Sequence, residues 1–118
     1  METKDKIAAV DLYIKAFKDT DMAIIKDLYA TDAIVEDPVG TDVHVGIDAV
    51  CAFYEGAIAS GAKLVPSGTP RCAGNAVAFP FQVTMPGMTI DVIDVFEFND
   101  SGKVVSMKAY WGPENLTA

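Results

Sequence analysis

Apolar residues at the start of the chain recur at steps of three and four, the spacing that places them on one face of a helix. This pattern predicts a helix from Thr3 to about Lys18. Tyr13 lies at the border of the apolar stripe, so the helix carries a phenol to the edge of the core. The members of the stripe are Ile7, Val10, Ile14 and Phe17.

Two more helices and a short strand are predicted in the first half of the chain. The second helix follows Thr20 and Asp21, either of which can cap it. The segment "DAIVEDPVG" is typical of a short strand that Pro38 terminates. A third helix is predicted from near Gly46 to about Ala59, with Tyr54 on its apolar side.

The second half of the chain alternates apolar and polar residues, which is the period of a strand. The segment "KLVPSGTPR" predicts an irregular strand, and "NAVAFPFQVTM", "IDVIDVFEF" and "KVVSMKAYW" predict three regular ones. Turns are expected at "PG" and "NDSG" between them. Three helices, one strand among them and a run of antiparallel strands define an α+β fold, with the helices on one face of a curved sheet. No repeat or linker divides residues 1–118, so we expect a single domain.

Helices packed on a strongly bent sheet enclose a conical space, which the inward faces of the strands would line. The same side chains more often fill a core, so an apolar cavity and a packed core are both open at this point. The candidate lining residues are Phe53, Phe79, Phe81, Val92, Phe96, Met107 and Trp111.

The strand "IDVIDVFEF" places a carboxyl group on its more apolar face. Asp94 shares that face with Val92 and Phe96, whereas Asp91 and Glu97 point the other way. A buried carboxylate without a partner is costly, so such a group stays protonated and can donate a hydrogen bond to an oxygen that gains negative charge. A basic partner for Asp94, or burial of the other face of the strand, is the alternative.

Asp37 and Tyr13 are the other two candidate groups. Asp37 precedes Pro38 at the end of a strand beside the expected cavity, a position that suits a general base. An Asp-Pro turn is the common alternative. Tyr13 is either a second hydrogen-bond donor beside Asp94 or a core tyrosine whose hydroxyl bonds a backbone carbonyl.

Composition and charge restrict the partners. Hydrophobic residues make up 51% of the chain, which suggests an apolar pocket, a subunit interface or both. A net charge of −8 disfavours nucleic acid as a partner and does not repel a neutral apolar molecule. No apolar run is long enough for membrane insertion, and the charged start "METKDKIAAV" lacks a signal-peptide pattern, so a cytoplasmic location is expected.

We assign neither the two cysteines nor the single histidine to a functional site. Cys51 and Cys72 are most simply reduced, packed thiols. His44 cannot build a metal site without further ligands, so we assign it to a surface or loop and expect no bound metal.

Taken in order, these segments resemble the bacterial ketosteroid isomerases over nearly the whole chain. The motifs are "DLYIKAF" with Tyr13, "LYATDAIVEDPVG" with Asp37, "AVCAFYEG" with Tyr54, "VIDVFEFNDSGKVVSMKAYWG" with Asp94, and the ending "ENL". The resemblance implies a cone-shaped nuclear-transport-factor-two-like fold, a homodimer and no cofactor.

The resemblance also implies a reaction and roles for the matched residues. In that family the aspartate matching Asp37 abstracts a proton next to a steroid ketone and returns it two carbons along, so a β,γ-unsaturated 3-oxosteroid becomes the α,β-unsaturated isomer. Tyr13 and a protonated Asp94 would donate hydrogen bonds to the dienolate oxygen; the family is itself the standard example of a carboxylic acid kept neutral at neutral pH. Tyr54 and Tyr29 would form a hydroxyl network behind Tyr13. A cis bond before Pro38 is a further implication.

The sequence departs from the family in one segment: the hairpin "QVTMPGMTIDVI" is several residues shorter than in the family members. Two alternative functions also remain open. The same cone also suits another small-molecule enzyme, such as a cyclase, dehydratase or epoxide hydrolase, or a noncatalytic module that binds hydrophobic ligands. A dehydratase commonly needs a histidine near its acid and base, and His44 is expected in a loop outside the cavity wall.

Overall fold

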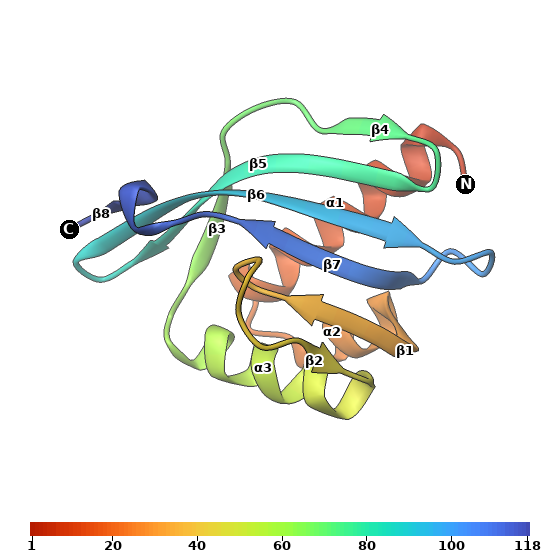
Figure 1. The fold of residues 1–118 in the computed structure, drawn as a ribbon, viewed down its shortest axis with the longest axis horizontal. Helices are drawn as coiled ribbons and strands as arrows, with labels where there is room; N and C mark the ends of the chain where they lie inside the picture. Colours follow the sequence, from red (N-terminus) through yellow and green to blue (C-terminus); the bar gives the residue numbers. More distant parts are fainter.

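The computed structural model describes residues 1–118 and has three helices packed on one side of an eight-stranded sheet (Figure 1). This architecture confirms the predicted fold class. The helices are α1 (Thr3–Lys18), α2 (Met22–Leu28) and α3 (Ile47–Ala59), with a short 3-10 helix η1 (Pro113–Asn115) near the end. The strands are β1 (Tyr29–Glu36), β2 (His44–Val45), β3 (Lys63–Pro66), β4 (Arg71–Ala73), β5 (Ala76–Met85), β6 (Met88–Phe98), β7 (Val104–Tyr110) and β8 (Leu116–Thr117).

The sheet is mixed, although all but one of its strand pairs are antiparallel. Its main order is β2-β1-β7-β6-β5-β3, and β4 and β8 pair with β5 and β6. The exception is β1, which lies parallel to β7. In Figure 1 the helix α1 crosses behind the long strands β5, β6 and β7, while α3 lies along the other margin beside β1 and β2. The space between α1, α3 and the sheet holds the core.

The buried face of α1 differs from the predicted stripe by a small rotation. Its buried residues are centred on Tyr13, which is 3% exposed, whereas Ile7 and Ile14 lie at the border. Ala9 and Ala16 stand on the same buried face, and their small side chains let the helix approach the sheet closely. Tyr13 therefore points into the interior, not along its edge as the sequence suggested.

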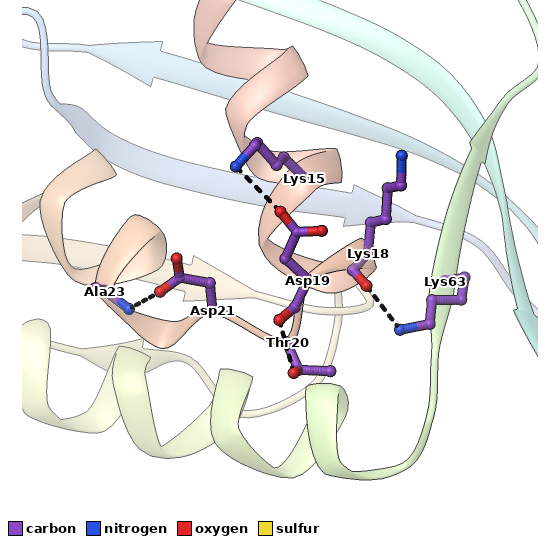
Figure 2. A network of polar contacts seen from close by, with 7 residues as sticks. All are labelled: Lys15, Lys18, Asp19, Thr20, Asp21, Ala23 and Lys63. Carbon is purple, nitrogen blue, oxygen red and sulfur yellow. Dashed lines mark hydrogen bonds and ion pairs between the residues drawn. The ribbon is translucent and has the colours of Figure 1, made fainter.

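The connection between α1 and α2 is fixed by polar contacts (Figure 2). The Asp21 carboxylate accepts a hydrogen bond from the backbone N–H of Ala23 and caps α2. The Lys63 ammonium, on β3, donates to the carbonyl oxygens of Phe17 at 2.8 Å and Lys18 at 3.3 Å. A cation at the carboxyl end of a helix satisfies unpaired carbonyls and opposes the helix dipole. This contact ties the end of α1 to the sheet next to Phe17.

The predicted faces of β6 are confirmed. Ile90, Val92, Asp94, Phe96 and Phe98 are all buried beneath the helices. On β7 the pairing register shifts after Glu97, so that Val104 is buried and Val105 is only half-buried. No helix of the structure is both long and apolar enough to cross a membrane.

Candidate active site

A cavity of about 230 Å³ lies between α1, α3 and the inward face of the sheet. Thirteen of its sixteen lining residues are hydrophobic, so the space suits an apolar molecule. The lining consists of Tyr13, Phe17, Asp37, Phe53, Tyr54, Ala57, Ser60, Ala62, Leu64, Phe81, Val83, Met85, Ile90, Val92, Asp94 and Trp111.

Four of the seven apolar residues expected to line this cavity do so: Phe53, Phe81, Val92 and Trp111. The prediction is wrong for Phe79, Phe96 and Met107, which are at most 2% exposed and pack behind the cavity. The Phe79 and Phe96 rings contact the Tyr13 ring edge to face, with centroids 5.9 and 5.1 Å away. These aromatic rings pack together behind the cavity and support the Tyr13 side chain that lines it.

The Asp94 carboxyl lines the cavity but is shielded from solvent. The residue is 1% exposed, takes part in none of the ion pairs, and its Oδ1 atom has no hydrogen-bond partner. Burial raises the pKa of Asp94 well above its ordinary value, and the negative charge of Asp37 raises it further, while a contact with the Tyr13 hydroxyl acts in the opposite direction. Asp94 therefore has no basic partner, and burial favours its neutral form.

The Asp37 carboxyl reaches the same cavity from the end of β1. It is half-buried, precedes a cis peptide bond to Pro38, and its Oδ1 accepts a hydrogen bond from the Trp111 indole N–H at 2.9 Å. Burial raises the pKa of Asp37, while the indole N–H and the nearby His44 lower it. Asp37 is thus less deeply buried than Asp94, and the indole N–H favours its charged form.

Trp111 was expected only as a wall residue, and its contact with Asp37 was missed. The contact depends on the parallel pairing of β1 with β7, which brings the ends of both strands together. Nothing in the periodicity of either strand indicates which strands pair in parallel.

Three tyrosine hydroxyls form a buried chain behind the cavity. The Tyr13 and Tyr54 hydroxyl oxygens are 3.1 Å apart, and Tyr54 is also hydrogen-bonded to the hydroxyl of Tyr29. Burial raises the pKa of all three phenols, so each stays protonated at neutral pH. Tyr13 and Tyr54 line the cavity, whereas Tyr29 lies behind them at the start of β1.

His44 lies outside the cavity, as expected, although it belongs to β2 and not to a loop. Its ring packs on the ring of Phe53, with centroids 4.7 Å apart. No group of three or more His, Cys, Asp or Glu side chains lies close enough together to hold a metal ion.

The site therefore joins two dissimilar carboxyls and a phenol in one apolar space. Burial favours the neutral form of Asp94, which could donate a hydrogen bond, as could Tyr13, and Asp37 has a hydrogen-bond partner for its charged form. A base with two hydrogen-bond donors in an apolar cavity suits proton abstraction next to a carbonyl, because negative charge then develops on the carbonyl oxygen.

Three helices packed on a mostly antiparallel sheet, with an apolar cavity between them, define the nuclear transport factor 2-like fold. The chain belongs to the SnoaL-like domain family, whose model matches residues 10–107. It is 36% identical over 113 residues to a steroid Delta-isomerase of Nocardioides simplex, an alignment that covers 92% of this chain and 91% of that protein. The resemblance to ketosteroid isomerases is thereby confirmed.

A solved structure of an epoxide hydrolase/cyclase-like enzyme, SalBIII, with a role in pyran ring formation in the polyether salinomycin, has the same fold. The two structures superpose with a TM-score of 0.92 at 24% sequence identity, over 99% of this chain and 98% of the other. This likeness concerns the fold.

Proposed function

We propose that the protein is a steroid delta-isomerase that converts β,γ-unsaturated 3-oxosteroids into their α,β-unsaturated isomers. The observation that carries the proposal is the pairing of Asp94, buried with an unpartnered oxygen, with Asp37 in a single apolar cavity. The 36% identical relative that is a steroid Delta-isomerase supports the same reaction class.

The reaction proceeds by proton transfer within one substrate molecule. The Asp37 carboxylate removes a proton from the carbon between the ketone and the double bond, and the electron pair moves toward the ketone oxygen to give a dienolate. The same carboxyl then returns the proton two carbons along, and the electron pair moves back to form the conjugated double bond. Proton and electrons begin and end on the steroid, so the reaction uses no external oxidant or reductant.

Tyr13 and Asp94 stabilise the dienolate by donating hydrogen bonds to its oxygen. Both groups are uncharged before the reaction because burial raises their pKa values, so their protons are available as charge develops. Each such donor contributes on the order of 3 kcal/mol to the transition state. Tyr54 and Tyr29 hold the Tyr13 hydroxyl in place through the phenol chain.

The substrate is a small, neutral, apolar molecule, since the lining is largely hydrophobic and the chain carries a net charge of −8. Nucleic acid remains disfavoured as a partner for the same electrostatic reason. The cytoplasmic location stays a prediction from the sequence.

The function is tested by mixing the purified protein with 5-androstene-3,17-dione and following the absorbance of the conjugated enone. We expect catalytic turnover that is proportional to protein concentration. Binding of an equilenin-like phenol without any turnover would instead favour a noncatalytic binding module. Hydrolysis of an epoxide substrate without isomerisation would favour an epoxide hydrolase on the same fold.

We further propose that the protein forms a homodimer through the outer face of the sheet, opposite the helices. Ile93 on β6 and Tyr110 on β7 are register partners there, and each is 48% exposed. Pro80 is the β5 partner of Ile93, so the apolar area continues onto a third strand. Large apolar groups gathered on an uncovered sheet face are typical of a subunit interface.

The Ile93→Asp variant should convert this dimer to a monomer, because the dimer would bury the new charge without a partner. Sedimentation analysis of the wild type should give about twice the 12.6 kDa chain mass, and of the variant about the chain mass itself. Leu12→Asp is the matched control, since Leu12 is 44% exposed on α1, away from this face, and should remain dimeric. A monomeric wild type would contradict the proposal.

A further inference from the structure

One polar side chain in the cavity wall is not used by the proposed mechanism. Only three of the sixteen lining residues are not hydrophobic, and they are Asp37, Asp94 and Ser60. The first two are the base and the neutral acid. Ser60 belongs to neither group, and an isolated hydroxyl in an otherwise apolar wall is where a second polar group of a ligand would bind.

Ser60 lies where the end of α3 meets the β5–β6 hairpin, away from Asp94. It follows the last residue of α3, six positions after Tyr54, which corresponds to about 9 Å along the helix axis. Its hydroxyl oxygen is 3.8 Å from the sulfur of Met85, at the tip of the β5–β6 hairpin. On β5 the register partner of Asp94 is Phe79, six positions before Met85, about 20 Å along the strand. Helix and hairpin thus both place Ser60 far from the reacting end.

The Ser60 side chain is exposed, whereas Tyr13 and Asp94 are buried. A ligand whose ketone contacts Tyr13 and Asp94 would therefore extend outward along α3 and bring its remote end to Ser60.

The hydroxyl proton of Ser60 is already used within the helix end. Ser60 donates it to the carbonyl oxygen of Ala57. The backbone N–H that would normally reach this carbonyl, that of Gly61, bonds Ile58 instead. A serine hydroxyl has one proton and two lone pairs, so Ser60 faces the cavity mouth as a hydrogen-bond acceptor.

From this geometry we infer, on the basis of the proposed function, that Ser60 selects steroids with a hydroxyl group at the end remote from the reacting ketone. A remote hydroxyl donates its proton to the Ser60 oxygen while Ser60 keeps its bond to Ala57. A remote ketone has only lone pairs and meets an acceptor; to bind it, Ser60 must release the Ala57 carbonyl. The preferred substrate class is therefore the 17-hydroxy rather than the 17-keto 3-oxo-5-androstenes.

The inference is tested by comparing the 17-hydroxy and 17-keto substrates, which differ only at the remote oxygen. For the wild type we expect kcat/KM to be about fivefold higher for the hydroxy substrate, as one net hydrogen bond provides. The difference should lie in KM with similar kcat, because Ser60 is remote from the reacting atoms. Ser60→Ala should abolish the preference by weakening the hydroxy substrate alone. The matched control is Ser101→Ala, in the β6–β7 turn and outside the cavity, which should keep the wild-type preference.

Equal specificity of the wild type for both substrates would overturn the inference, as would a preference that survives Ser60→Ala. A second readout separates this inference from the proposed function. Trp111 is the single tryptophan and lines the cavity, so its fluorescence reports binding of the conjugated 17-hydroxy and 17-keto steroids without turnover. A tighter Kd for the hydroxy steroid that Ser60→Ala removes would support the inference even if no isomerisation occurs, and equal Kd values would refute it.

Discussion

Asp37→Asn is expected to lower kcat for the isomerisation on the order of 10⁴-fold, the upper range for loss of a general base. The amide has nearly the same shape as the carboxyl, and its oxygen can still accept the hydrogen bond from the Trp111 indole. It cannot take a proton from carbon. Fold, cavity and steroid affinity should therefore be preserved while catalysis is lost, and the enone absorbance assay measures this directly.

The pH dependence of the wild type provides a second check on the assigned base. Asp37 acts only when ionised, and its pKa lies above the ordinary 3.8 because of burial. As the pH falls through this raised pKa, the carboxylate is protonated and kcat/KM should decrease in proportion. Residual activity of Asp37→Asn near the wild-type level would show that another group abstracts the proton.

The local structure was largely predictable because it follows from periodicity and from residues that end helices. The bounds of α1 and α3 follow from apolar spacing, and Asp21 caps α2 as one of two candidates named in advance. The alternation in "IDVIDVFEF" was sufficient to place Asp94 on the buried face, since a strand with one apolar face has only two ways to lie.

The sequence could not predict which residues on the buried face of a strand line the cavity and which pack behind it. Phe79 and Phe81 share a face of β5, yet Phe81 lines the cavity and Phe79 packs behind it. Period two distinguishes the faces of a strand but not positions along it. The rotation that centres Tyr13 on α1 depends in the same way on how closely Ala9 and Ala16 let the helix approach the sheet.

The pairing of strands that are far apart in the sequence could not be predicted either. The contact between Asp37 and Trp111 joins residues 74 positions apart, and it exists because β1 and β7 pair in parallel. The two-residue strands β2 and β8 are too short to have a period, so neither was predicted.

Asp94→Ala is expected to lower kcat by about 10³-fold, as the loss of one oxyanion donor does in other enzymes. Alanine removes the neutral acid and leaves Tyr13 as the remaining donor to the dienolate oxygen. Asp94→Asn is the matched control, because the amide keeps an uncharged N–H donor of similar size and should lose less activity. The assay is again the appearance of the conjugated enone. Equal, full activity of wild type and Asp94→Ala would exclude Asp94 from the oxyanion hole.

Asp94→Asn should also change how the free energy of unfolding depends on pH. In the folded state the pKa of Asp94 lies well above 3.8, so between that value and the raised pKa the native state holds a proton that the unfolded chain has released. The free energy of unfolding of the wild type should therefore fall as pH rises through this window. Asp94→Asn carries no titrating group at this position and should give a flatter pH profile of the free energy of unfolding in urea denaturation. Above the window the variant should be the more stable protein.

Identical profiles would mean that Asp94 ionises normally in the folded protein, and then its proton would not be available to the dienolate at neutral pH. Stability and catalysis are thus two measurements of one property, the neutral state of a carboxyl that the fold keeps from water.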